Sequence, residues 1–155
     1  MRRENGLSGR LPPKFILGYT SDETVLLDFD KMKLKNVKYW ARRAMKWHKL
    51  GGILILESSL NSYHVVFDRP VTWSENVRIV AWVALYVKRR SLDNWFKMQC
   101  IKQKPTLRAS NKKIVGGVVK SPPRVVYSEG TQDREIGDYL LLRDLILDVS
   151  KELNL

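Results

Sequence analysis

Two stretches near the start of the chain, 14–19 and 23–30, are rich in apolar residues and joined by a short polar turn, a pattern that predicts two β-strands. The spacing then becomes helical over 34–50, up to a glycine pair that ends the predicted helix. The apolar side of this helix is formed by Leu34, Val37, Ala41, Ala44 and His48. The chain is therefore expected to open with two strands followed by a helix.

The next segments predict a β-hairpin and a second helix. Apolar runs at 53–58 and 62–68 flank a short polar turn, which is the pattern of two antiparallel strands. Thr72 and Glu75 have the spacing of a capping box, so a helix is expected to begin there and to run to about Arg90. The residues expected to face inward are Val77, Val80, Ala81, Ala84 and Leu85.

The remaining segments complete an α+β pattern. Residues 95–101 have the composition of a fourth strand, 114–127 that of short strands interrupted by Gly and Pro, and 132–153 that of an amphipathic helix. The apolar side of that last helix is formed by Ile136, Leu140, Ile146 and Val149. From 23 to 101 the order is β-α-β-β-α-β, the split βαβ or ferredoxin-like arrangement. The expected fold is an open-faced antiparallel sheet of this RRM-like palm type, with extra β-strands and a C-terminal helix.

The length of the chain suits one domain. A chain of 155 residues with 44% hydrophobic residues can bury a core of its own. Residues 1–13 are expected to form a flexible basic arm that ends at a proline pair, and 14–155 a single domain. Cys100 is the only cysteine, which excludes an intrachain disulfide and a cysteine-based zinc site and favours a reducing, cytoplasmic compartment. No apolar run reaches the roughly 18 residues of a membrane span, so no membrane partner is expected.

In a ferredoxin-like sheet the first and third strands lie side by side, and the two helices cover one face. Because side chains alternate along a strand, Phe29 in the helix-covered core directs Asp28 and Asp30 to the opposite, open face. The same argument places Ser62 and His64 on that open face of the neighbouring strand. Two carboxylates, a hydroxyl and an imidazole are therefore expected to converge.

Two carboxylates this close repel each other unless a cation lies between them. Oxygen ligands at this spacing suit Mg²⁺ or Mn²⁺, which complete their shell with water and substrate phosphates. Asp28 and Asp30 are therefore candidate metal ligands of a site for phosphoryl or nucleotidyl transfer. Two simpler interpretations stay open: Asp30 can cap the helix that follows it, and His64 can be a structural histidine.

The charge balance favours a polyanionic partner. Lys and Arg number 28 against 16 Asp and Glu, a formal charge of +12, and nucleic acid is the commonest partner of such a domain. No acid lies between Asp30 and Glu57 to neutralise the predicted helix at 34–50 within its own sequence. The candidate phosphate-contacting cations of that helix are Lys35, Lys38, Arg42, Lys46 and Lys49, with Arg43 nearby. The alternative is an ordinary solvated face.

The tryptophans are numerous for this length, and their spacing favours core packing. They are Trp40, Trp47, Trp73, Trp82 and Trp95. A base-stacking role for one of them stays open.

Two short motifs follow each other along the predicted sheet: Asp-X-Asp in "LDFD", and Ser-X-His in "NSYHVVF". With these motifs, the chain resembles the archaeo-eukaryotic primase superfamily, the primase-polymerases of archaea, eukaryotes and many plasmids and viruses, over roughly residues 15 to 115. The resemblance implies that Asp28 and Asp30 bind the catalytic metals. It also implies that Ser62 and His64 contact the phosphates of an incoming nucleotide.

The third motif of that family, a hydrophobic residue followed by Asp, is not evident in this sequence. Asp93 precedes the predicted fourth strand and Asp68 ends the third, and neither fits well, so the site is expected to hold one metal or to be degenerate. The family carries phosphate-binding cations just before the place where this chain has its basic tract. The residues that could take that role are Arg108, Lys112 and Lys113, for which a solvated loop is the alternative.

The resemblance implies a metal-dependent nucleotidyltransferase that synthesises or extends primers in replication. Its catalytic residues would be Asp28, Asp30 and His64, its cofactor Mg²⁺ or Mn²⁺, and its partners nucleoside triphosphates and nucleic acid, DNA rather than RNA. A replication helicase or an accessory primase subunit would supply further domains. One alternative is a non-catalytic RRM-like nucleic-acid-binding module. Another is a rolling-circle nuclease, which needs two histidines on one strand, whereas His48 and His64 lie on different elements.

Overall fold

The computed structural model describes residues 16–113 and 119–153, and the expected N-terminal arm lies outside this part of the chain. The strands are β2 (Gly18–Thr20), β3 (Leu26–Phe29), β4 (Gly52–Ser59), β5 (Ser62–Phe67), β6 (Thr106–Arg108), β7 (Lys112–Lys113), β8 (Val119–Lys120) and β9 (Arg124–Gly130). The helices are α1 (Leu34–Trp47), α2 (Trp73–Val87), α3 (Arg90–Lys102) and α4 (Glu135–Glu152). The described part of the chain is thus α+β, as expected.

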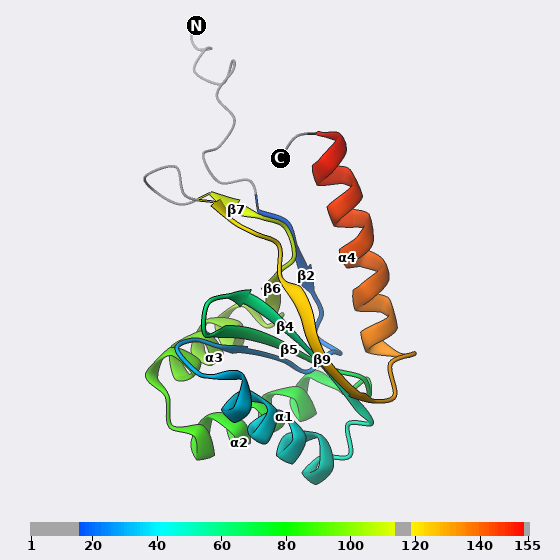
Figure 1. Cartoon of the computed structure of the whole chain (residues 1–155). Helices are drawn as coiled ribbons and strands as arrows, with labels where there is room; N and C mark the ends of the chain where they lie inside the picture. Colours follow the sequence, from blue (N-terminus) through cyan, green and yellow to red (C-terminus); the bar gives the residue numbers. More distant parts are fainter. Residues whose placement is uncertain (1–15, 114–118, 154–155) are drawn as a thin grey trace, which may run out of the picture.

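The main sheet is antiparallel and has the strand order β3-β5-β4-β9 (Figure 1). The predicted pairing of the first and third strands is confirmed, because β3 and β5 are neighbours in this sheet. The predicted hairpin is also confirmed as β4 and β5. At the far edge, β9 pairs with β4 and extends the sheet beyond the β-α-β-β part of the chain. The strand expected at 14–19 is displaced to β2, which pairs with β6 in a separate ribbon.

The predicted fourth strand is wrong, because residues 95–101 lie within α3. Leu92 and Gln99 of this helix are buried at helical spacing, and Trp95 packs against both apolar clusters of the protein. A strand would place Trp95 and Ile101 on one face, yet Ile101 is 75% exposed. The burial of this segment therefore follows helical spacing. Helix α3, rather than a fourth strand, contacts β3.

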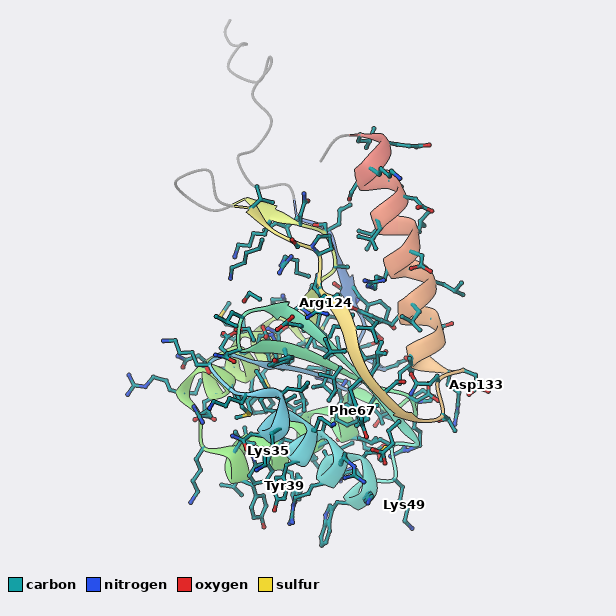
Figure 2. The ribbon with its side chains drawn as sticks, in the orientation of Figure 1. Lys35, Tyr39, Lys49, Phe67, Arg124 and Asp133 are labelled. Atoms are coloured by element: carbon teal, nitrogen blue, oxygen red, sulfur yellow. The ribbon has the colours of Figure 1, made fainter. Side chains whose placement is uncertain are left out.

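Helices α1 and α2 cover one face of the main sheet, as Figure 1 shows. Phe29 packs beneath them as predicted, together with the residues that alternation places on the same face: Val25, Leu27, Tyr63, Val65 and Phe67. Figure 2 shows Phe67 on this helical side of the sheet. The face assignment of β3 and β5 is therefore confirmed.

The opposite face is not open along its whole length, which corrects the expected open-faced sheet. Helix α4 and the β2–β6 ribbon lie over it (Figure 1). A second apolar cluster fills this layer and consists of Tyr19, Leu26, Leu54, Leu56, Val66, Leu107, Ile136 and Tyr139. This face is covered because β3, β4 and β5 carry apolar residues on both sides, which is typical of strands that are buried on two faces. The end of this face near Asp28 holds a cavity.

The helix boundaries follow local chemistry. Thr72 caps α2, because its hydroxyl accepts a hydrogen bond from the backbone N–H of Glu75 at 3.1 Å, as predicted. The Glu75 carboxylate pairs with Arg69 at 2.8 Å. The expected inward position of Leu85 is wrong, since its side chain is 67% exposed. Within the described ranges, no helix has both the length and the apolar character needed to span a membrane.

Candidate functional site

Asp28 on β3 and His64 on β5 are directly opposed in the main sheet. Their side chains lie on the face that α1 and α2 leave free, and His64 Nε2 lies 3.8 Å from Asp28 Oδ1. The imidazole is 5% exposed, whereas the Asp28 side chain keeps 26% of its surface. The convergence predicted from strand alternation is thus confirmed for this pair.

A cavity of about 260 Å³ opens at this point of the sheet. Its acidic and imidazole lining consists of Asp28, Asp30 and His64. Its cationic and hydroxyl lining consists of Arg108, Lys112, Lys120, Ser58 and Ser59. Two acids and three cations therefore share one small cavity, which suits a ligand that carries both a metal cation and several anionic oxygens.

The Asp28 carboxyl has an unusually high pKa. Burial is the larger cause and the neighbouring Asp30 carboxylate the next, and together they raise the pKa from 3.8 to about 7, while Arg108 and Lys120 act in the opposite direction. Near pH 7 this carboxyl is therefore only partly ionised. A bound cation would favour its charged form.

The His64 imidazole is shifted in the other sense. Burial, and then the Arg108 guanidinium, lower its pKa to about 3. The ring is neutral at physiological pH, so its contact with Asp28 is not an ion pair. Nε2 is the nitrogen that faces Asp28, whereas Nδ1 is buried without a hydrogen-bond partner. The proton of the neutral ring is therefore best placed on Nε2, where it can be donated to an acceptor in the cavity.

Arg108 fixes the rim of the cavity. Its guanidinium donates hydrogen bonds to the carbonyl oxygens of Ser58 and Ser121, each at 3.0 Å, and also to that of Ser110. These bonds tie β6 to the β4–β5 hairpin and to the segment after β8. Burial lowers the pKa of Arg108, yet the group remains a cation at neutral pH. Arg108 therefore lines the cavity, and its predicted role in nucleotide binding stays a prediction.

Lys112 and Lys120 are directly opposed in the β7–β8 pair, and both line the cavity. Like charges at opposed positions of a strand pair destabilise it. An anion between the two ammonium groups would remove that repulsion, so this pair of lysines is suited to bind a phosphate group. Lys112 was a predicted site residue, whereas the side chain of the predicted Lys113 lies outside the part of the chain that the structure describes.

The predicted Ser62 and the two acids considered for the third motif, Asp68 and Asp93, are not among the residues that line the cavity. Ser62 begins β5 opposite Ser59. Asp93 lies in the first turn of α3 and lines a different cavity between α2 and α3. Asp68 is fully buried and accepts hydrogen bonds from the Thr131 hydroxyl and from two backbone N–H groups at the start of α4. Asp68 therefore anchors α4, and neither acid supplies a third carboxylate at the site.

The alternative that Asp30 caps the next helix is wrong. The N-cap residue of α1 is Lys33, and it makes no side-chain cap hydrogen bond. Asp30 is exposed and lines the cavity with Asp28. The two acids therefore share the cavity, as the strand alternation predicted.

The donor set fits one hard divalent cation. Among residues 16–113 and 119–153, no group of three or more His, Cys, Asp or Glu side chains could hold a metal ion by itself. Asp28 and Asp30 offer carboxylate oxygens, and their mutual repulsion raises the pKa of Asp28. Mg²⁺ and Mn²⁺ commonly bind through one or two carboxylates and take their other ligands from water and substrate phosphates. Three cations line the same cavity: Arg108, Lys112 and Lys120.

The predicted basic side of α1 divides into two groups. Arg42 is paired with Glu129 of β9 at 2.8 Å, and Lys38 lies over the Tyr127 ring at 4.2 Å. These acid and aromatic partners come from far along the chain, which is why the sequence of the helix alone does not reveal them. The other group is exposed and consists of Lys35 and Lys46 on α1 and Lys49 just after it, of which Figure 2 labels Lys35 and Lys49.

The sequence did not point to Ser58, Ser59 or Lys120. The pairing of β4 with β5 shifts register between Glu57 and Ser59, and this bulge lies at the cavity. Lys120 reaches the cavity through the β7–β8 pairing. The polar "ESS" end of the β4 strand was the available signal for the bulge, whereas nothing singled out Lys120 among the basic residues.

Comparisons with protein-family models, with curated proteins and with solved structures found no match for this chain. The resemblance to primase-polymerases thus rests on the two short motifs and stays a prediction.

Proposed function

We propose that the cavity at Asp28 and His64 is a metal-dependent nucleotidyl-transfer site of the primase-polymerase type, which acts on nucleoside triphosphates and nucleic acid. The observation that carries the proposal is the direct opposition of Asp28 and His64 in a cavity walled by three cations. The two motifs are separated by a helix and a strand in the sequence, and the sheet brings them into contact. DNA is the preferred nucleic acid, and a helicase or accessory subunit would be supplied by other chains.

Phosphate binding is assigned to the cationic wall. Arg108 is held by backbone carbonyls and so is preorganised, which limits the entropy lost on binding an anion. Lys112 and Lys120 form an opposed pair that an anionic group would stabilise. A triphosphate against this wall would have its reacting phosphate beside the two aspartates.

Asp28 and Asp30 would hold the divalent cation. When bound, the cation neutralises charge on the triphosphate and stabilises the charge that develops during transfer. Ionisation of Asp28 is required for this role, and its pKa of about 7 makes metal binding compete with a proton.

His64 would orient the nucleotide rather than neutralise it. Its low pKa keeps the ring uncharged, so it can donate one neutral hydrogen bond from Nε2 to a phosphate oxygen. Its burial between β3 and β4 fixes the ring. We expect a fixed neutral donor to select the position of a phosphate, while Arg108 and the lysines supply charge.

A second candidate is a non-catalytic module that binds nucleic acid or nucleotides. It is favoured by one observation: only two acids line the cavity, and the third acid of the family motif is not evident. The two candidates share the phosphate wall and differ in the transfer step. An activity assay therefore separates them.

The test is incorporation of labelled nucleotides on a primed and on an unprimed DNA template, with Mg²⁺ or Mn²⁺. We expect incorporation by the wild type and a loss of at least about 100-fold in Asp28→Asn and in Asp30→Asn, because each removes a metal ligand. Asp93→Asn is the matched control, since Asp93 is an acid that lies in another cavity. It should retain full activity.

Two results would contradict the proposal. Incorporation that survives Asp28→Asn unchanged would place the chemistry elsewhere. Nucleotide binding by the wild type without incorporation under either metal would favour the non-catalytic module. Thermal unfolding of each variant serves as the check that the fold is retained.

A further inference from the structure

An exposed aromatic cluster lies on the helical side of the molecule, across the sheet from the cavity. Trp47 at the end of α1 stacks on Trp82 of α2, with ring centroids 6.1 Å apart and an angle of 15° between the planes. Tyr86 lies one helical turn beyond Trp82, with the centroids 5.0 Å apart. His48 contacts the edge of the same Trp82 ring. The aromatic platform is defined here as Trp47, Trp82 and Tyr86.

This platform is not part of the core. Trp47 is 70% exposed and Tyr86 is 53% exposed, and the neighbouring Leu85 is also exposed. The expectation that the tryptophans serve core packing is therefore wrong for Trp47. Exposure of large rings next to one another on a helix surface costs hydration free energy, and it marks a surface that a ligand covers.

The charges around the platform identify the ligand class. Exposed cations lie within four residues of Trp47 or Trp82 along the chain: Arg43 and Lys46 on α1, Lys49 just after α1, and Arg78 on α2. Helix α1 contains no acid, and the acid of α2, Glu75, is engaged by Arg69 at 2.8 Å. A frame of cations around exposed rings complements a polyanion that carries aromatic groups of its own.

We infer that the aromatic platform and its flanking cations bind single-stranded nucleic acid, with a base stacked on Trp47 and the phosphates beside the cations of α1 and α2. Base faces are available for such stacking only when the strand is unpaired. Figure 1 shows α1 and α2, which carry the platform, on one face of the main sheet. The cavity is lined by Asp28 and His64, whose side chains lie on the opposite face. This strand-holding site is therefore independent of nucleotidyl transfer at Asp28.

The experiment measures binding of a labelled oligodeoxynucleotide by fluorescence anisotropy, in EDTA and without nucleotide. Wild-type protein should bind the single strand more tightly than the duplex of the same length, and more tightly than an abasic strand with the same backbone. Trp47→Ala should weaken binding of the base-bearing strand about fivefold or more and leave the abasic strand unchanged. Trp47→Phe should retain most of the affinity, and Tyr86→Ala should lose part of it.

The matched control is Leu141→Ala on α4, which removes a side chain of 72% exposure far from the platform and should change nothing. Equal affinity of the wild type for base-bearing and abasic strands would overturn the inference, as would an unchanged affinity in Trp47→Ala. In that case the platform is a docking face for a protein. Because EDTA removes divalent cations, failure of the nucleotidyl-transfer proposal would leave this result unaffected.

Discussion

At the scale of single residues, the pKa of Asp28 is raised and the pKa of His64 is lowered, and both shifts favour the uncharged form of the side chain. Burial raises the pKa of Asp28 to about 7 and lowers the pKa of His64 to about 3, so both groups are held toward their uncharged forms. A cavity that disfavours charge on its own residues, and yet has cations on its wall, is arranged for charge that a ligand brings. The pH dependence of stability tests this arrangement.

Asp28→Asn should stabilise the protein in a pH-dependent way. The folded state binds the Asp28 proton more tightly than the unfolded state does, so stability is undiminished below about pH 4 and is lost as pH rises from 3.8 to about 7. The amide removes this loss, and we expect a gain of about 1–3 kcal/mol near pH 8 that vanishes near pH 4. Urea denaturation of both proteins across this range, without metal, measures the difference.

Both the wild type and Asp28→Asn retain His64, so His64 serves as an internal reference for the pH dependence of stability. Its lowered pKa reduces stability as pH falls below about 6.5, and it does so equally in each. A difference between Asp28→Asn and wild type that is constant with pH would show that the Asp28 carboxyl is not buried as an ionisable group.

At the scale of elements, the cavity depends on how short strands are joined. Arg108 connects β6 to the β4–β5 hairpin at Ser58, and the β7–β8 ribbon adds Lys112 and Lys120. Asp68 holds the start of α4, whose Ile136 and Tyr139 pack over that sheet face together with the β2–β6 ribbon. The cavity therefore lies at the part of this sheet face that α4 and the β2–β6 ribbon do not fill.

Two substitutions in α3 test whether residues 95–101 form a helix or the strand predicted from the sequence. Trp95 packs against both apolar clusters, whereas Ile101 is 75% exposed. We expect Trp95→Ala to destabilise the protein by about 2–4 kcal/mol and Ile101→Ala to change stability by less than about 0.5 kcal/mol. Similar losses for the two variants, measured by urea denaturation, would favour the strand in which both side chains share one face.

At the scale of the whole molecule, two groups of cations lie on opposite sides of the main sheet. One group lines the cavity, and the other lies near the aromatic platform on α1 and α2. Helix α4 is different, since its acids outnumber its cations. The net charge of +12 is therefore not carried by α4, and a polyanionic partner is expected on other surfaces.

The sequence was sufficient where local periodicity determined the structure. Alternation in β3 and β5 predicted the faces of Asp28 and His64, because register on a sheet with buried faces is strongly constrained. It was insufficient where distant segments decided the outcome. The partner of Arg42 is Glu129, and the apolar run of α3 fits either period until its packing is known. Asp68 resembled a candidate ligand because its partners at the start of α4 are remote in sequence.

The central claim is that Asp28 and Asp30 hold a divalent cation beside a triphosphate. The most direct measurement is electron paramagnetic resonance of Mn²⁺ titrated into the protein with a non-hydrolysable nucleoside triphosphate. We predict a saturable bound signal that strengthens as pH rises through about 7, that is lost in the Asp28→Asn/Asp30→Asn double variant, and that is retained in Asp93→Asn. Equal binding of Mn²⁺ by the wild type and the double variant, above that of the nucleotide alone, would contradict the account.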